Sequence, residues 1–175
     1  DGDVWFYGVL KNTGDGPLEH PRINVSMLNE DKTEVVGTTY GFAERFVLNP
    51  NEVTPFRVLG KSAPPFAHAT ATVDLQAAAR HHKPVKLRLV QHTLTPQSSM
   101  MLLSGTIKNT GDQPLQFVQV IALARDKQGR PIGYASAYAS AKRLKSGASA
   151  PFSSFFFLSR KPAHIDFDFD GTPTN

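Results

Sequence analysis

The carboxylates best placed for chemistry lie near the end of the chain, where Asp166, Asp168 and Asp170 alternate with apolar residues. Side chains at every second position of a β-strand share one face, so the three carboxylates would form a row. Such a row could bind calcium weakly or supply the paired carboxylates of a hydrolase. The same alternation puts Phe167 and Phe169 on the opposite face, which favours a buried apolar face and a solvated acidic one. We therefore predict no metal site and no catalytic carboxylate here.

Histidines are the other residues that could bind a metal or act as general bases. His81 and His82 are adjacent, so on a strand they would point to opposite faces and could not chelate one ion together. The absence of cysteine excludes thiolate metal sites and thiol nucleophiles. The chain also lacks the sequence motifs of α/β-hydrolases, zinc proteases, phosphate loops and dinucleotide sites. We predict a protein that is not an enzyme and holds no metal or cofactor; a hydrolase or metal-dependent enzyme is the catalytic alternative.

A short basic run could contact phosphates, lipid headgroups or acidic glycans. It lacks the interleaved aromatic residues of nucleic-acid-binding segments, and the formal net charge of the chain is only +4. A solvated linker is therefore the favoured interpretation, and no nucleic-acid partner is predicted. Its candidate partner-binding residues are Arg80, Lys83, Lys86 and Arg88.

Aromatic residues near the N-terminus form the second group of binding candidates. Trp5 and Tyr7 alternate with Val4 and Phe6, so if Phe6 lies in the core the two larger rings face outward. They would contact a neighbouring strand or domain, or form a binding patch. The candidate partner-binding residues of this segment are Val4, Trp5, Tyr7 and Val9. The aromatic residues that could stack on a sugar are Trp5, Tyr7, Tyr40, Tyr134 and Tyr138.

An internal repeat organises the elements that must position these residues. Residues 8–18 and 105–115 are identical at eight of eleven positions at an offset of 97, and later matches follow at an offset of 96, including Phe56 with Phe152. We expect the extra residue of the first copy at His20-Pro21, as a bulge or kink. The matches indicate a tandem duplication. They predict domains at residues 1–80 and 85–175, with a boundary between Gln76 and Pro84.

Both copies show the period-two alternation of antiparallel strands, with turn clusters every 8 to 12 residues as in β-sandwiches. The 13 glycines and 13 prolines suit many short elements joined by turns. In the repeated Asn-Thr-Gly-Asp turns, Gly14 and Gly111 are expected at positive φ. Helix signals are poor, and only residues 75–80 could form a turn or two.

The second copy carries a recurrent motif most completely, at Gly105, Asn109, Asp126, Gly129, Leu144, Gly147, Pro151 and Phe152. In the first copy Glu30, Thr33 and Asn51 stand in for Asp126, Gly129 and Gly147. This motif resembles that of the bacterial FxLYD-type immunoglobulin-like domains.

This resemblance implies an all-β fold of two tandem immunoglobulin-like antiparallel β-sandwiches. It also implies a non-catalytic extracytoplasmic binding, spacer or assembly module of a bacterial envelope protein. The expected location is periplasmic or at the cell surface, with any anchor in a segment outside this chain. The expected partner is a protein of the cell envelope, and the alternative is a carbohydrate-binding module that uses exposed aromatic residues. No membrane span is expected, because no apolar run approaches the roughly 20 residues of a membrane helix.

The repeat finally predicts an open strand edge in the first copy. Residues 85–94 alternate well enough to form the opening strand of the second sandwich, with a break near Val90. At the repeat offset, the equivalent strand of the first copy would precede residue 1. The strand at residues 4–10 should therefore have an edge that is unpaired or filled by another segment, and such an edge is a template for a partner strand.

Overall fold

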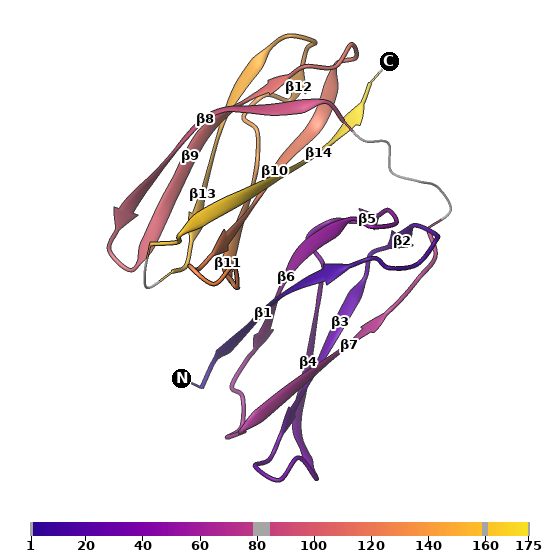
Figure 1. The fold of residues 1–175 in the computed structure, drawn as a ribbon, viewed down its shortest axis with the longest axis vertical. Coiled ribbons are helices and arrows are strands. Elements are labelled where there is room, and N and C mark those ends of the chain that lie inside the picture. The colour runs from indigo at the N-terminus through magenta and orange to yellow at the C-terminus, as the bar shows by residue number, and fades with distance from the viewer. Residues whose placement is uncertain (1, 79–84, 159–160, 175) are drawn as a thin grey trace. The chain divides into compact units, whose positions relative to one another are not determined.

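The computed structural model describes residues 2–78, 85–158 and 161–174. The chain divides into two compact units, residues 1–82 and 83–175, which we call unit 1 and unit 2. All elements of the described residues are β-strands, and the paired strands are antiparallel (Figure 1). The predicted all-β class is confirmed. The expected helical turn at residues 75–80 is wrong in its described part, where Ala77 instead forms a β-bridge with Leu18.

The described strands follow the alternation of the sequence closely. Those of unit 1 are β1 (Val4–Lys11), β2 (Leu18–Glu19), β3 (Arg22–Leu28), β4 (Val35–Phe42), β5 (Val47–Leu48), β6 (Val53–Gly60) and β7 (His68–Asp74). Those of unit 2 are β8 (Leu87–Gln97), β9 (Met100–Asn109), β10 (Leu115–Arg125), β11 (Pro131–Tyr138), β12 (Arg143–Leu144), β13 (Ser149–Phe156) and β14 (His164–Pro173).

Unit 2 contains two sheets that bury their apolar faces against each other. One has the strand order β13-β9-β8, and the other β11-β10-β14, with the short β12 also paired to β10. Ile107 of β9, Val120 of β10 and Phe152 of β13 meet in a single core cluster. Because alternate side chains of each strand point into this cluster, the packing explains the period-two pattern of the sequence.

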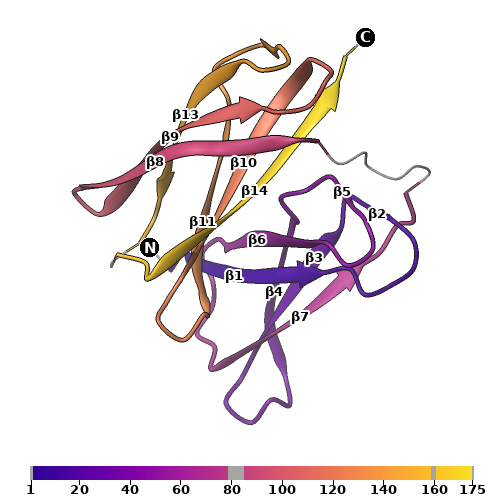
Figure 2. The same ribbon diagram turned by 45° about the horizontal axis from the view of Figure 1, so that its top comes forward.

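Unit 1 repeats this plan with smaller sheets (Figure 2). Its sheets have the orders β1-β6 and β4-β3-β7, and the short pair β2-β5 completes one end. Ile23 and Val25 of β3 pack against Val58 of β6, with Phe6 and Phe56 partly buried around them. The core of unit 1 is therefore smaller than the core of unit 2.

A glycine–phenylalanine pair sets the same strand register in both units. Gly8 lies opposite Phe56 in the β1–β6 pair, and Gly105 lies opposite Phe152 in the β9–β13 pair. A Cβ atom on either glycine would collide with the ring across from it. The glycines are thus repeated because the ring lies over the strand. The predicted equivalence of Phe56 and Phe152 agrees with this register, but Phe56 is only half-buried whereas Phe152 is buried.

A buried asparagine closes the repeated turn in each unit. The Nδ2 group of Asn12 donates to the carbonyl oxygens of Gly16 and Leu48, at 2.9 Å each, and its Oδ1 accepts from the Gly14 N–H at 3.0 Å. Asn109 makes the equivalent three bonds in unit 2. The side chain therefore shapes the turn, and the expectation of positive φ at Gly14 and Gly111 is wrong. Positive φ occurs instead at the equivalent residues Asn51 and Gly147.

The position of the extra residue in unit 1 also differs from the prediction. His20 and Phe117 both have positive φ and are 97 residues apart, so the kink at His20 is common to both copies. Leu28 of unit 1 and Arg125 of unit 2 are equivalent residues and still lie 97 positions apart. Leu28 pairs with Val35, and Arg125 pairs with Pro131. These two partners are also equivalent, but they lie only 96 positions apart. The insertion thus lies in the turn between β3 and β4.

With the insertion in the β3–β4 turn, two residues of this turn correspond to other residues of unit 2 than expected from the sequence. Asn29 and Lys32 correspond to Asp126 and Gly129, in place of the expected Glu30 and Thr33. In each turn the N–H of the later residue bonds to the carbonyl of the earlier one. A turn tolerates an added residue better than a strand, where a shift by one would exchange buried and exposed faces.

Candidate functional site

The open edge of β1 is the feature of the fold best suited to binding. Among the described residues β1 pairs with β6 alone, whereas its equivalent in unit 2, β9, has β13 on one side and β8 on the other (Figure 1). The open edge predicted from the repeat is found. β8 also shows the expected break in alternation, as a register shift between Leu89 and Gln91.

The direction of the backbone groups along β1 follows from a bond at its end. The N–H of Asn12 donates to the carbonyl of Glu52, and the carbonyl of Asn12 accepts from the N–H of Asn51, so Asn12 faces β6. Successive residues of an antiparallel strand face alternate neighbours. Trp5, Tyr7, Val9 and Lys11 therefore direct their N–H and C=O groups away from β6. We call this set of backbone groups the β1 edge.

The side chains of the predicted β1 residues lie as the alternation requires. Trp5 is 46% exposed and Tyr7 is also exposed, while Val4 and Val9 are half-buried. The Arg57 guanidinium lies 4.7 Å from the centre of the Trp5 ring, in a cation–π contact across the β1–β6 pair. Trp5 thus contacts a neighbouring strand and keeps about half of its surface open.

Only two of the four candidate residues of the basic run lie in the part of the chain that the structure describes. Lys86 and Arg88 are exposed in unit 2, and the carbonyl of Lys86 accepts a 2.8 Å bond from the Thr110 N–H beside β8. Arg80 and Lys83 lie outside the described residues, as do His81 and His82. The structure therefore brings the four β1 candidates together and leaves the basic candidates untested as a group.

An exposed aromatic patch on unit 1 was only partly anticipated. The His20 ring stacks on Phe42 at 3.9 Å between centroids and lies 5.1 Å from Phe46, and Tyr40 meets Phe42 edge-on. Tyr40 and Phe46 are each 56% exposed. We call His20, Tyr40, Phe42 and Phe46 the aromatic patch. Only Tyr40 was a sequence candidate, because the others meet through the kink at His20, which no local pattern reveals.

Unit 2 has a related but more open arrangement at the equivalent place. Phe117 and Tyr138 correspond to His20 and Phe42, and Phe117 is 70% exposed. Together with Lys142 they line a cavity of about 440 Å³. Tyr134 is half-buried, so it is a weaker stacking candidate than Tyr138.

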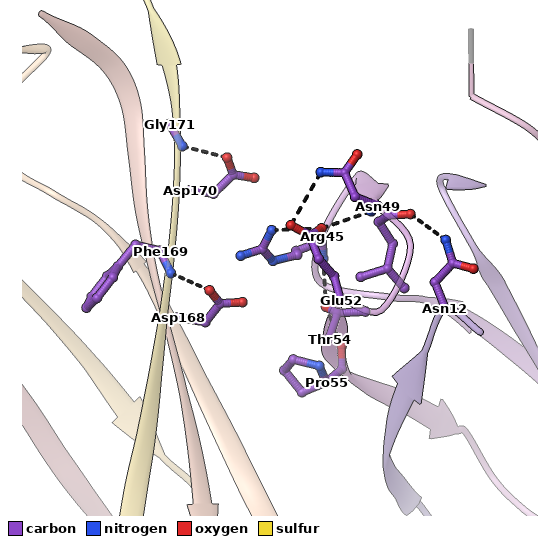
Figure 3. Close-up of polar contacts among 11 residues, drawn as sticks. Asn12, Arg45, Asn49, Glu52, Thr54, Pro55, Asp168, Phe169, Asp170 and Gly171 are labelled. Atoms are coloured by element: carbon purple, nitrogen blue, oxygen red, sulfur yellow. Dashed lines mark hydrogen bonds and ion pairs between the residues drawn. The ribbon is translucent and has the colours of Figure 1, made fainter. Parts of the chain in front are cut away.

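The acidic row of β14 is used within the strand and its neighbours. Asp166 pairs with Arg125, and Asp168 and Asp170 each accept from the N–H of the next residue (Figure 3). No cluster of three or more metal-binding side chains occurs within residues 2–78, 85–158 and 161–174. No helix in these ranges is long and apolar enough to cross a membrane.

The carboxylate of Asp126 has a clearly shifted pKa. Burial by itself would raise the pKa of Asp126, but hydrogen bonds and charge from Arg130 and the Gln128 N–H outweigh it and lower the pKa below the ordinary 3.8. Its Oδ2 lies 2.8 Å from Arg130 Nε, and its Oδ1 accepts from two backbone N–H groups. All of these bonds are within the β10–β11 turn, so the shift reflects turn closure.

Comparison with known proteins adds no assignment to this geometry. No protein-family model matches the chain, and no curated protein matches it significantly. The resemblance of the two copies to FxLYD-type domains therefore stays a prediction.

Proposed function

We propose that this chain is a non-catalytic binding and assembly module of a bacterial cell envelope, which holds an extended segment of a partner protein on the β1 edge. A strand edge with free backbone groups binds another strand by main-chain hydrogen bonds, and side-chain pockets supply the specificity. The observation that carries the proposal is that this edge lacks the residues that usually discourage pairing with another strand. Residues 4–10 contain no charged residue and no proline.

In unit 2 the outer strand of the equivalent sheet is β8, and it carries features that discourage a further strand from pairing with it. β8 carries Arg88, a bulge near Val90 and Pro96, and each of these features discourages pairing at an exposed edge. β1 has neither a bulge nor a proline in the corresponding outer position of its sheet, and its one charged residue, Lys11, stands at the end of the strand. An unprotected apolar edge is a hazard unless a partner covers it.

The envelope location is supported by the resemblance of the repeat. The absence of cysteine is compatible with an oxidising compartment. Fractionation of the source cells tests the location, and recovery of the protein from the cytoplasmic fraction would contradict it.

The experiment for the binding function blocks the β1 edge without breaking the β1–β6 pair. Val9→Pro removes an N–H that faces away from β6, which an edge strand tolerates. The matched control Val9→Ala shortens the same side chain and keeps the N–H. The probe is a synthetic peptide with the sequence of residues 85–97, the segment that covers β9 in unit 2.

Binding is followed by the fluorescence of Trp5, the only tryptophan of the chain, and by amide hydrogen exchange. We expect the peptide to protect the amides of Tyr7, Val9 and Lys11 in the unchanged chain and in Val9→Ala. We expect Val9→Pro to bind at least ten-fold more weakly. Equal binding by Val9→Pro, or no binding to any form at millimolar peptide, would refute the proposal.

A carbohydrate-binding module is the second candidate, and the aromatic patch favours it. Exposed rings on one sheet face can stack on sugar rings, and Arg22 lies 3.9 Å from the centre of the Tyr40 ring beside them. Retardation of the chain in gels containing soluble polysaccharides tests this function. We expect any retardation to be lost in Tyr40→Ala and kept in Thr38→Ala, a substitution of an exposed residue on the same strand.

A further inference from the structure

Unit 2 contains a template for the strand that the β1 edge would accept. β8 pairs with β9 from Leu87 opposite Asn109 to Gln97 opposite Met100, and Leu87, Leu89 and Leu94 pack against the core. The shared glycine–phenylalanine register makes β1 the equivalent of β9. An incoming strand in the β8 position would therefore run antiparallel to β1.

Among the described residues no strand covers the side chains of β1 as β8 covers those of β9. Met101, Leu103 and Ile107 of β9 are all buried, and Ile107 has no exposed surface. Their equivalents Val4, Phe6 and Leu10 are only half-buried. An apolar stripe that is covered in unit 2 is thus open to solvent in unit 1, and its burial would favour binding.

The strand of the second sheet that faces the β8 position is β14 in unit 2 and β7 in unit 1. These two strands differ more strongly than β1 and β9 do. In unit 2 the inward residues of β14 are Ile165, Phe167 and Phe169, which pack against the core. β8 contacts this strand directly, and the rings of His92 and Phe167 lie 4.8 Å apart.

In unit 1 the equivalent strand β7 carries small residues at the same places. Ala69, Ala71 and Val73 pair with the buried Met27, Val25 and Ile23, so they share the inward face. Ala69 and Ala71 are nevertheless exposed. The position of the Phe167 ring is therefore taken by the much smaller methyl group of Ala71, which is exposed.

We infer that this surface, formed by the β1 edge and the small residues of β7, selects a partner strand with bulkier inward side chains than β8. The inference rests on the proposed function. The ligand is an extended segment of a separate protein, with apolar residues at alternate positions and an aromatic residue opposite Ala71. The aromatic ring supplies from the partner the volume that Phe167 supplies within unit 2.

The test compares two peptides on the full chain. The first has the sequence of residues 85–97, and the second carries a phenylalanine at the His92 position (His92→Phe). We expect the second to bind at least ten-fold more tightly, measured by Trp5 fluorescence. Equal affinities, or tighter binding of the first peptide, would overturn the volume inference and leave strand addition intact. Absence of binding by both peptides would instead refute the proposed function.

The variant Ala71→Phe supplies the reciprocal measurement. Because this variant supplies the ring that Phe167 supplies in unit 2, we expect it to remove the preference for the His92→Phe peptide. The exposed control Thr72→Ala on the same strand should keep that preference. A preference that survives Ala71→Phe would contradict the inference. Self-association of the chain in sedimentation experiments, abolished by Val9→Pro, would also overturn it by making a second copy the occupant.

Discussion

Replacing the buried Asn12 by alanine gives a direct test of how unit 1 is held together. Its side chain makes three hydrogen bonds, two as donor to the carbonyls of Gly16 and Leu48 and one as acceptor from the Gly14 N–H. A hydrogen bond contributes about 0.5 to 1.5 kcal/mol net, and a buried group left without a partner costs more. We therefore expect Asn12→Ala to lower the free energy of unfolding of unit 1 by about 2 to 4 kcal/mol.

Urea unfolding followed by Trp5 fluorescence reports on unit 1, because Trp5 is the only tryptophan and lies on β1. With a slope of about 1 kcal/mol per molar urea, the midpoint should fall by about 2 to 4 M. Asp15→Ala, in the exposed part of the same turn, is the control and should leave the midpoint nearly unchanged. A loss below about 0.5 kcal/mol for Asn12→Ala would refute the view that this side chain closes the turn.

Three further predictions concern other positions of the repeat. Gly105→Ala should destabilise unit 2 by about 1 to 3 kcal/mol in thermal unfolding, because its Cβ would lie 2.6 Å from the Phe152 ring and 2.7 Å from the Gln91 carbonyl oxygen; a neutral effect would show that the ring can move away. Gly147→Ala should lower the free energy of unfolding by about 1 kcal/mol, because the φ of Gly147 is +74°. Gly14→Ala should be nearly neutral in the same assay, since the nearest atom to its Cβ would be 3.5 Å away. A larger loss for Gly14→Ala than for Gly147→Ala would contradict the turn geometry. The pKa of Asp126 is lowered in the folded state. Its contribution to the free energy of unfolding is therefore fully present above its ordinary pKa and is lost as the pH falls through the lowered pKa. Asp126→Asn should weaken the loss of stability at acid pH in unfolding measured between pH 2 and 7, and an unchanged pH dependence would show that the contribution is negligible.

The period-two pattern and the repeat were sufficient to predict the strands and the open edge. Alternation is local, because each strand places its own side chains on two faces whatever the rest of the chain does. The break near Val90 was visible for the same reason, and it is the bulge of β8. The unpaired edge of β1 among the described residues was predicted by comparing the two copies, which act as an internal control for each other.

Other features depend on contacts between segments that are distant in sequence, and only the tertiary structure decided them. The conformation of Gly14 is set by the Asn12 side chain, which reaches the carbonyl of Leu48, 36 residues away. The aromatic patch forms because the kink at His20 brings its ring onto Phe42. Ala71 gains significance only when β7 is seen opposite the vacant strand position. Alternation determines which face of a strand a residue occupies, but the partner across that face depends on how the sheets pack.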